Sequence, residues 1–539
     1  MQRDLDRLAG ESFDVLVVGG GIHGLAAAYD AAQRGFSVAL VERGDFGSGA
    51  SFNHLKTVHG GLRYLQTGDL KRMRESILER RTLARIAPHL LTRLPFLMPT
   101  YLKPTRSRLA MWVAFRVDAV IGSDRNDGVT PRLHLPAGRI LSKDECLRAF
   151  PDVRRQGLTG GALWHDLQMR NADRLTLAFA LAADAAGACL ANHAEALAPI
   201  LLDGRAVGAR VRDHASGAEI DVRARITLNA AGAATGRLMA ALGRQEAFPL
   251  IKAMNLVTRR SFDGPALASS TRDGRMLFIV PWEGRAVVGT SHAPKPCGPD
   301  ETQVTAEELR WFVGQVNEAF PAMRLGPEDV TLVHRGIVPA ARSRKGEWGL
   351  EGHFRLRDHA HDGVEGAVSL VAVKYTTARG VAEAAVDLVA RKLGRRVPSR
   401  TAQVPLPGGE IADLDALRVM ARRDAAGLVD DEAATQLADT YGSAYPALLR
   451  MVREAPSAGA RLAPDLPVIA AQVLHAVRDE MTITLTDLVT RRLPLGAAGH
   501  PGAEAARACA VLMAREIGWD AARVERELGA LAAFYAPVS

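Results

Sequence analysis

The sequence predicts an α/β protein with a Rossmann-type dinucleotide-binding domain, a second region rich in β-strands, and a helical region at the C-terminal end. Three observations lead to this prediction. A glycine-rich turn lies between an apolar strand pattern and an alanine-rich helix pattern near the N-terminus, strand patterns recur through the middle of the chain, and helical periodicity dominates beyond residue 405.

The glycine-rich turn follows an apolar strand pattern at Asp14–Val18 and has the form G-x-G-x-x-G, with Gly19, Gly21 and Gly24 at the glycine positions. The first glycine permits a tight turn, the second lets the backbone approach a pyrophosphate, and the third lets helix and strand pack closely. The helix that begins at Leu25 would point its N-terminus at the phosphates.

A second strand pattern at Ser37–Val41 leads to Glu42, whose carboxylate would accept hydrogen bonds from the ribose hydroxyls of a dinucleotide. Strand, glycine turn, helix, strand and acid in this order favour a dinucleotide site over a glycine turn in an ordinary α/β domain. A later strand pattern leads directly to Lys374 and then to a helix, a second place where backbone amides would face the same ligand.

The composition limits the partners of this chain. With 539 residues the chain is too long for one core, and its formal net charge of +8 favours anionic substrates, anionic lipid or nucleic acid. The arginine pairs Arg80-Arg81 and Arg259-Arg260 have no interleaved stacking aromatics. Nucleic-acid binding is therefore disfavoured.

The cysteines Cys146, Cys189, Cys297 and Cys509 stand far apart, so the sequence predicts neither a disulfide framework nor a zinc site. A reducing, cytoplasmic compartment fits this usage best. The polar N-terminus leaves no room for a signal peptide, and no apolar run reaches the roughly 18 residues that would span a bilayer.

Helical periodicity among many arginines predicts a basic amphipathic helix over Lys71–Ile86. The apolar stretches Leu90–Met98 and Leu109–Ile121 follow it, and the second is another helix candidate. Together they fit a patch on a membrane surface, and equally well segments that pack on the protein's own core.

Strand patterns at Pro249–Gly352 predict an antiparallel sheet that forms a lid over a substrate. The apolar strand in Arg225–Gly232 would return to the dinucleotide domain. At Pro405 to Gly409 the composition changes, and proline with paired glycines marks the boundary of a separate helical domain.

Several motifs together resemble the FAD-dependent glycerol-3-phosphate dehydrogenase family: GGGIHG, HGGLRYL at His59–Leu65, LNAAG, PWEGRAVVGTS at Pro281–Ser291 and KYTTAR at Lys374–Arg379. The resemblance implies a glutathione-reductase-like FAD domain, a β-rich substrate domain of the D-amino-acid-oxidase type, and an all-helical C-terminal domain. It also implies oxidation of sn-glycerol 3-phosphate to dihydroxyacetone phosphate by hydride transfer to flavin N5. Electrons would pass to a membrane quinone, from an enzyme bound at the anionic cytoplasmic face of the inner membrane, and a homodimer is left open.

The resemblance divides the chain into an oxidoreductase region, 1–404, and a helical domain, 405–539. Within the first region the FAD-binding segments are expected at about 12–90, 150–248 and 353–400, and the substrate-binding segments at about 91–149 and 249–352.

The reaction removes a hydride and a proton from a secondary alcohol that carries a phosphate, so the site needs a proton acceptor and cations. The catalytic residues implied are Arg63, Lys374, Asn255 and His59, and the substrate-binding residues are Arg63, Tyr64, Lys252, Lys374 and Thr376. The implied cofactor-binding residues are Gly19, Gly21, Ile22, His23, Gly24, Glu42, Arg43, Ser51, His54, Lys56, Thr57, His59, Gly60, Gly61, Ala231, Gly232, Lys374, Thr376 and Thr377.

The chain departs from the family pattern at a histidine near the reacting carbon. Where the family has Lys-Gly-Ser-His, this chain ends in Asn255, which cannot act as a general base. His59, His292 and His334 are the candidate replacements.

A second departure removes a phosphate-binding arginine. The family's Gly-Val-Arg-Pro becomes Gly-Ile-Val-Pro here, with Val338 at the arginine position, and Arg335, Arg342 or Arg344 would have to replace it. Loss of one hydrogen bond to a charged group would weaken phosphate binding by about 10- to 100-fold. Alternatives are therefore kept: an FAD oxidoreductase of the same fold that acts on another hydroxy compound or an amine, and an inactive flavin-binding scaffold.

Two further motifs involve histidines. His54 falls near the position where some related amine-oxidising flavoproteins carry a histidine bonded covalently to FAD, and the alternative is a hydrogen bond to the cofactor or a carbonyl. The stretch Asp358–Asp362 holds metal-ligand types, but its spacing matches no common site, so we expect a surface loop and no metal.

Overall fold

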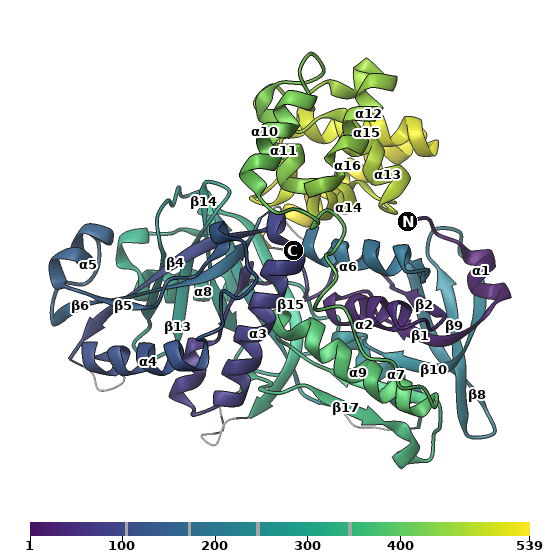
Figure 1. Ribbon diagram of the computed structural model, residues 1–539, viewed down its shortest axis with the longest axis horizontal. Coiled ribbons are helices and arrows are strands. Elements are labelled where there is room, and N and C mark those ends of the chain that lie inside the picture. The colour runs from purple at the N-terminus through teal and green to yellow at the C-terminus, as the bar shows by residue number, and fades with distance from the viewer. Residues whose placement is uncertain (103–105, 171–173, 244–247, 343–345, 347, 539) are drawn as a thin grey trace.

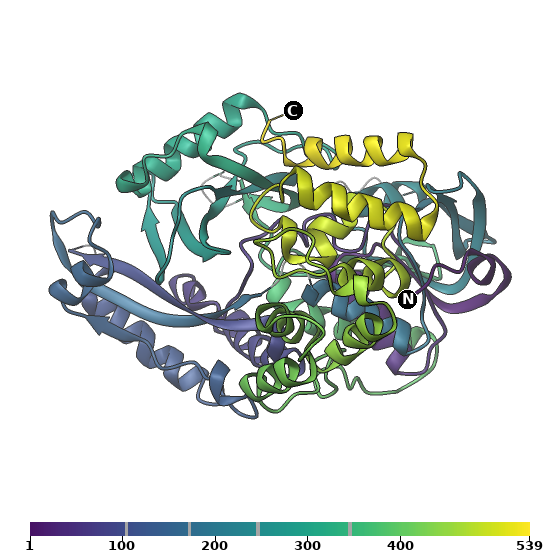
Figure 2. The same cartoon turned by 90° about the horizontal axis from the view of Figure 1, so that it is seen from above.

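The computed structural model describes residues 1–102, 106–170, 174–243, 248–342, 346 and 348–538. Two sheets lie side by side, and the C-terminal helices cover them from one side (Figure 1). Seen from above, the last helices lie across the junction of the two sheet regions (Figure 2). None of the helices in these ranges combines the length and apolar character needed to cross a membrane.

The first sheet has the strand order β17-β18-β10-β1-β2-β7, and β8 and β9 extend it from β10. Its parallel core is β1 (Ser12–Val18), β2 (Val38–Val41), β7 (Cys189–Ala191), β10 (Glu219–Asn229) and β18 (Ala367–Val371). The antiparallel strands are β8 (Ala194–Leu202), β9 (Arg205–Asp213) and β17 (Arg355–Asp358). Strand β2 and the Val15–Val18 part of β1 are apolar and buried, as is typical of parallel strands that are covered on both faces.

Helix α2 (Ile22–Gln33) packs between α6 (Arg174–Ala185) and α9 (Ala378–Lys392) beside this sheet. Alanines on α2 are buried with Leu177, Phe179 and Val386 in one hydrophobic cluster. This is the layered arrangement of strands and helices that the glycine turn predicts. The α/β fold class predicted from the sequence is therefore confirmed.

The second sheet has the order β16-β15-β11-β14-β13-β12-β4-β6-β3, with β5 paired to β6. Its strands are β3 (Thr57–Val58), β4 (Leu91–Tyr101), β5 (Arg139–Leu141), β6 (Leu158–Met169), β11 (Leu250–Thr258), β12 (Ala266–Ser270), β13 (Met276–Trp282), β14 (Arg285–His292), β15 (Val330–Arg342) and β16 (Trp348–Leu350). The helices on this part of the chain are α3 (Leu70–Ile86), α4 (Arg108–Ile121), α5 (Lys143–Ala149) and α8 (Ala306–Ala319). Short helices α1 (Leu5–Gly10) and α7 (Thr235–Ala241) belong to the first sheet's surroundings.

The C-terminal part is helical, as the sequence predicts. It contains α10 (Leu414–Asp424), α11 (Asp431–Tyr441), α12 (Tyr445–Glu454), α13 (Ala470–Asp479), α14 (Leu485–Asp487), a π-helical turn at Leu488–Arg492, α15 (Ala503–Ile517) and α16 (Ala521–Tyr535).

Strand pairing joins one part of the chain to a sheet that its sequence neighbours do not share. Within the segment 150–248, where FAD-binding residues are expected, strands β7 to β10 lie in the first sheet, whereas β6 pairs along its length with β4 in the second sheet. The apolar run at Leu90–Met98 lies mostly in β4, and the helix predicted at Leu109–Ile121 is confirmed as α4. Antiparallel pairing of β4 with β6 satisfies the backbone hydrogen-bonding groups of both strands. This pairing, between strands far apart in the sequence, places β6 in the second sheet. Helix α6 is described from Arg174 onward.

Candidate active site

One large cavity of about 1060 Å³ lies between the two sheets. Its wall includes the glycine turn after β1, the end of β10, the loop before β3, strands β11 and β13–β15 and the turn after β18. Small-molecule sites usually enclose about 300–1,000 Å³. This cavity is large enough for an extended cofactor with a small substrate beside it.

The glycine turn leaves no room for side chains. A Cβ at Gly24 would lie 1.9 Å from the carbonyl oxygen of Gly19, and a Cβ at Gly19 would lie 2.6 Å from that of Ala230. Gly19 also has a φ of 108°, a conformation that L side chains rarely adopt. Because the turn is this tight, the N-terminus of α2 opens toward the cavity.

Glu42 lies at the end of β2 and lines the cavity. Its Oε2 accepts the amide of Gly20 at 2.6 Å and its Oε1 accepts that of Gly44 at 2.8 Å. The carboxylate is therefore fixed beside the glycine turn, where a ribose would lie in a dinucleotide site. Acid and glycine cradle together fit an FAD cofactor, with Glu42 on the ribose and the α2 N-terminus on the pyrophosphate.

The loop between β2 and β3 forms another side of this cradle. Ser51 Oγ accepts the amide of Ile22 at 2.9 Å. The His54 ring stacks on Tyr375 with centroids 4.7 Å apart, and its Nδ1 accepts the amide of Lys56 at 3.0 Å. His54 lines the cavity, and the covalent link to FAD stays a prediction.

The HGGLRYL motif forms a turn that helix α3 and strand β6 hold in place. The amide of Gly60 donates to Asp166 Oδ1 at 2.7 Å, and Asp166 forms a buried ion pair with Arg80. A Cβ at Gly60 would lie 2.5 Å from the Arg80 guanidinium, and Gly61 adopts φ 79°. The two glycines are required by this close approach, and the turn presents Arg63 and Tyr64 to the cavity.

Lys374 follows β18 and reaches across the cavity wall to α3. Its ammonium donates to Ser76 Oγ and lies 4.6 Å from the centre of the Tyr64 ring, whose centre is 4.4 Å from the guanidinium carbon of Arg72. Burial, with a smaller contribution from the Arg72 charge, lowers the pKa of Lys374 to about 7. Near neutral pH this lysine can therefore exchange a proton.

The cavity also contains a cation and a hydrogen-bond donor without partners. Within the described ranges, the Arg63 side chain forms neither an ion pair nor a hydrogen bond, and the enclosing protein lowers its pKa. The Asn255 Oδ1 accepts from the Thr290 hydroxyl at 2.8 Å, whereas its buried Nδ2 has no partner among the described residues. An unpaired buried donor costs about 1–3 kcal/mol, so the Asn255 amide is positioned for a polar ligand. Arg63 is exposed to the open cavity, where its guanidinium can reach an anionic ligand.

Most residues that the sequence singled out lie together on this wall. They are Gly19, Gly21, Ile22, His23, Glu42, Arg43, Ser51, His54, Thr57, His59, Gly61, Arg63, Tyr64, Ala231, Gly232, Asn255, Lys374 and Thr376. Gly24, Lys56, Gly60, Lys252 and Thr377 do not line it. Gly24 and Gly60 shape the wall from behind, as their contacts above show.

Lys252 and Lys56 point away from the cavity for a clear reason. Lys252 Nζ pairs with the Glu308 carboxylate at 2.9 Å and also donates to the Gln303 carbonyl, so its charge is already compensated. Lys56 Nζ donates to the Phe52 carbonyl at 2.6 Å and lies over the Phe52 ring. Both side chains thus have protein partners and neither lines the cavity, while their predicted roles toward substrate and cofactor stay predictions.

Some of the residues proposed to replace the missing family histidine and arginine line the cavity, and others do not. His59, His292 and Arg335 line the cavity, whereas His334 is buried behind it against Phe52. Arg342 donates to the carbonyl of Gly346 and is not in the wall, and Arg344 lies outside the described residues. Burial lowers the pKa of His292 to about 4, so it is a weak base at neutral pH.

Sequence reasoning missed the residues that hold the reacting end of the cavity from behind. Arg72, Ser76 and Arg80 stand four residues apart on α3 and contact Tyr64, Lys374 and Asp166 in turn. This i, i+4, i+8 spacing was visible in the basic helix, but it was interpreted as a membrane patch or core packing. Such polar residues on the buried face of a helix were the available signal.

The chain matches the family model "FAD dependent oxidoreductase" over residues 14–388 and that of the "C-terminal domain of alpha-glycerophosphate oxidase" over residues 399–524. A glycerol-3-phosphate dehydrogenase of Synechocystis sp. is 31% identical over 91% of this chain and 90% of its own. The mitochondrial enzyme of that name from Bos taurus is 31% identical over 96% of this chain and 72% of its own.

Solved structures agree in fold. The glycerol-3-phosphate dehydrogenase of Bacillus halodurans, complexed with FAD, has a TM-score of 0.76 and 24% identity, with 98% of this chain and 95% of that chain covered. Glycine oxidase of Geobacillus kaustophilus has a TM-score of 0.51 and 20% identity, with 73% of this chain and 98% of that chain covered.

The fold, the glycine cradle and the family model define an FAD-dependent oxidoreductase, which confirms the predicted fold class and cofactor. Within that class, the identity over most of both chains shows that this chain belongs to the glycerol-3-phosphate dehydrogenase family. The resemblance stated from the sequence motifs is thus confirmed.

Proposed function

We propose that the protein oxidises sn-glycerol 3-phosphate to dihydroxyacetone phosphate and passes the electrons to a membrane quinone. The observation that carries the proposal is the grouping of Lys374, Arg63 and Asn255 on one cavity whose other end is the FAD cradle. The relatives named above, over most of their length, support the choice of substrate.

Lys374 is the proton acceptor in this proposal. When bound, FAD supplies the hydride acceptor at N5. A general base works best when its pKa lies near the working pH, and the pKa of Lys374 is about 7. The neutral amine takes the hydroxyl proton of the substrate, a role that neither Asn255 nor a histidine of pKa about 4 can fill as well.

Arg63 and Asn255 hold the substrate at its two ends. The Arg63 guanidinium offers a bidentate fork to the phosphate and is free of protein carboxylates in the described ranges. The Asn255 Nδ2 donates a hydrogen bond to the substrate oxygen as the proton leaves it. In this arrangement Asn255 orients the alcohol. Lys374 alone accepts the proton, because Asn255 replaces the histidine that the family has at this position.

Turnover tests the substrate assignment. Purified holoprotein is given sn-glycerol 3-phosphate, glycerol, lactate or glycine with an artificial electron acceptor, and the ketone or imine product is measured. Dihydroxyacetone phosphate should form, and the compounds without phosphate should react at least about tenfold more slowly, since none of them carries the phosphate that Arg63 binds in this proposal. Faster turnover of glycine would favour the alternative amine substrate.

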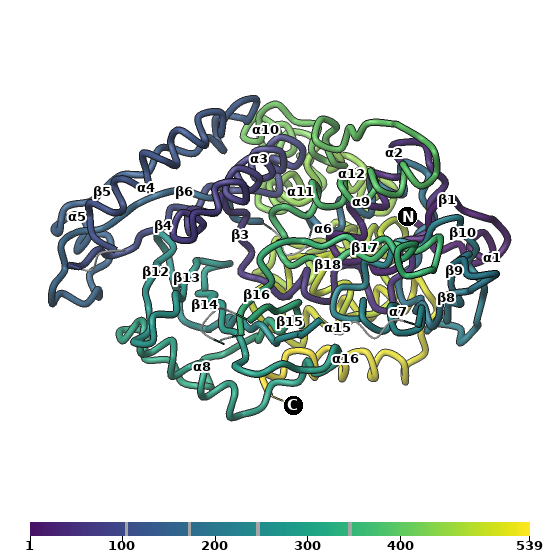
Figure 3. Tube along the Cα trace, turned by 90° about the horizontal axis from the view of Figure 1, so that it is seen from below, coloured from purple at the N-terminus to yellow at the C-terminus, as the bar shows by residue number. Residues whose placement is uncertain are grey.

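The membrane placement rests on a different observation, helix α4. Leu109, Trp112, Val113 and Val120 are 71%, 48%, 47% and 77% exposed and recur at helical spacing. Arg108 and Arg116 are exposed on the same helix, which lies at the end of the molecule far from β8 and β9 (Figure 3). An apolar stripe beside arginines fits an anionic lipid surface, so we propose that α4 docks the enzyme on the cytoplasmic face of the inner membrane, close to its quinone.

Substitution of Leu109 and Val120 by glutamine should lower binding to vesicles of anionic lipid by about tenfold or more, because two apolar side chains no longer enter the lipid. Co-sedimentation with the vesicles measures it. The matched control is Val419→Gln with Met420→Gln, since these residues of α10 are 58% and 55% exposed on another helix. Equal loss in both double variants would contradict a docking role for α4.

A further inference from the structure

The loop of residues 42–55, which we call the FAD loop, lies between the cofactor cavity and the C-terminal helices. On one side its residues line the cavity, among them Glu42, Ser51 and His54. Asp45 and Phe52 do not line the cavity and are buried on the other side, at 1% and 2% exposure. The loop therefore has one face toward FAD and one toward the C-terminal helices.

Asp45 is held by two arginines from the π-helical turn of the C-terminal part. Arg492 donates to both oxygens of Asp45, at 2.7 and 2.8 Å, and Arg491 Nε donates to Oδ2 at 2.7 Å. The charges are buried together, and the arginines strongly lower the pKa of Asp45. A buried bidentate ion pair of this kind fixes distance and orientation.

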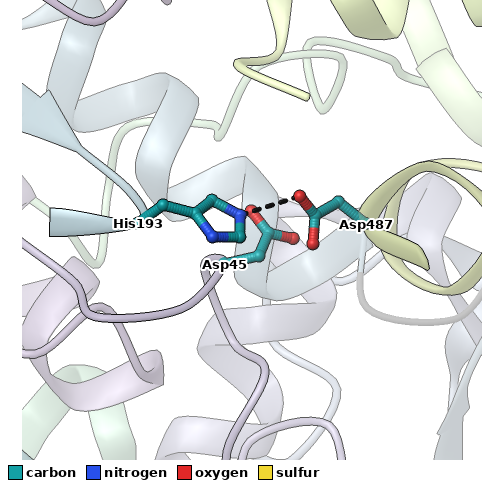
Figure 4. Close-up of side chains that lie close together, drawn as sticks. All are labelled: Asp45, His193 and Asp487. Atoms are coloured by element: carbon teal, nitrogen blue, oxygen red, sulfur yellow. Dashed lines mark hydrogen bonds and ion pairs between the residues drawn. The ribbon is translucent and has the colours of Figure 1, made fainter. Parts of the chain in front are cut away.

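Asp45, His193 and Asp487 come within 4.8 Å of one another and have metal-ligand types (Figure 4). However, the Asp45 oxygens already accept from Arg491, Arg492 and Asn192, and His193 Nε2 lies 2.9 Å from Asp487 Oδ2. Two arginine charges at this point would repel a cation. The cluster is thus an ion-pair contact between the FAD loop and the C-terminal helices.

Phe52 makes the second contact. Its ring belongs to the hydrophobic cluster that contains Val489, Leu493 and Met513, and its centroid lies 5.9 Å from that of Phe534 on α16. Asp45 and Phe52 thus bracket the segment that carries Ser51, and both contacts come from residues beyond 480.

Hydrogen bonds connect the FAD loop to the glycine turn, to Glu42 and to the start of α2, which together form the cofactor cradle. The amide of Gly47 donates to the carbonyl of Gly20 at 2.9 Å, and the Gly44 amide donates to the Glu42 carboxylate. Ser51 Oγ accepts the amide of Ile22 at the start of α2. Displacement of the loop would therefore disturb the glycine turn, the ribose-binding acid and the α2 N-terminus at once.

We propose that the C-terminal helices form the back of the FAD site, with Arg491 and Arg492 as positioning residues that hold the FAD loop closed on the cofactor. This role concerns retention of FAD and is independent of which substrate the enzyme oxidises. The C-terminal helical domain would thus contribute to cofactor binding, although Lys374, Arg63 and Asn255 belong to other parts of the chain.

The test is the rate at which FAD leaves the purified holoprotein. Arg492→Met keeps the length and apolar stem of the side chain and removes the bidentate pair with Asp45. Release, followed by the rise in free flavin fluorescence after dilution, should be about 10- to 100-fold faster than in the wild type, as expected for loss of charged hydrogen bonds. Anaerobic reduction by dithionite should remain unchanged in the fraction that still holds FAD.

Arg174→Met is the matched control. Arg174 on α6 also forms a buried ion pair with the C-terminal part, to Glu480 at 2.7 Å, but among the described residues it forms no hydrogen bond or ion pair with the FAD loop. The proposal requires faster FAD release in Arg492→Met than in Arg174→Met. Equal release in the two variants, or release unchanged from the wild type in Arg492→Met, would overturn it.

If Arg492→Met does not fold, Phe52→Leu decides the question. This change shortens the side chain but leaves the Asp45 pairs in place, so the protein should fold and release FAD several-fold faster than the wild type. FAD release at the wild-type rate from folded Phe52→Leu would then overturn the proposal.

Discussion

Replacement of Lys374 by methionine should lower the rate of flavin reduction by sn-glycerol 3-phosphate by about 100- to 10,000-fold, the usual contribution of a positioned general base. Methionine keeps much of the volume beside Ser76 and Tyr64 but cannot accept a proton. Anaerobic rapid mixing of the substrate with the holoprotein measures the rate directly. Reduction by dithionite should be unchanged, because it does not need the base.

The pH dependence gives this prediction its sign. With a pKa of about 7, Lys374 is mainly protonated below that pH and mainly neutral above it. The reduction rate at saturating substrate should therefore rise as the pH increases through about 7, and the rise should be absent in Lys374→Met. A rate that instead falls through this range would mean that the ammonium form is required, and Lys374 would then be a phosphate ligand.

Arg63→Gln should raise the KM for sn-glycerol 3-phosphate by about 10- to 100-fold, because a charged hydrogen bond to the phosphate is lost. Reactivity toward glycerol, which has no phosphate, should change much less. The ratio of kcat/KM for the two compounds isolates the phosphate contact from any general damage to the cavity.

Arg335→Gln is the matched control for Arg63. Arg335 also lines the cavity from β15, although its backbone amide is held by Asn53 at 2.8 Å. A larger loss of phosphate preference in Arg335→Gln than in Arg63→Gln would move the phosphate site to β15, where the departure at Val338 lies.

The FAD cradle was predictable because a short contiguous stretch determines it. Strand β1, the glycine turn, α2, β2 and Glu42 follow one another in the sequence, so spacing alone locates the cofactor site. The position of Lys374 at the site could be predicted for the same reason, since it comes shortly after a buried strand. Asn255 and Val338 could be recognised as departures only by resemblance to the family.

The supporting residues could not be predicted because pairing distant in sequence places them. Asp166 meets Gly60 only because β6 joins the second sheet, and Ser76 meets Lys374 across nearly the whole oxidoreductase region. Lys252 lies on the correct strand, but a carboxylate on α8 pairs with it. The contact of Asp45 with Arg492 likewise depends on how the C-terminal helices dock, which no local pattern encodes.

The most direct test of the account is anaerobic addition of sn-glycerol 3-phosphate to the wild-type holoprotein, with the flavin absorbance band near ~450 nm followed in time, because loss of this band reports reduction of the cofactor. Rapid bleaching by sn-glycerol 3-phosphate, and much slower bleaching by glycerol at the same concentration, is the predicted result. No bleaching by sn-glycerol 3-phosphate, in protein whose flavin dithionite still reduces, would contradict it and would mean that Asn255 and Val338 have changed the substrate.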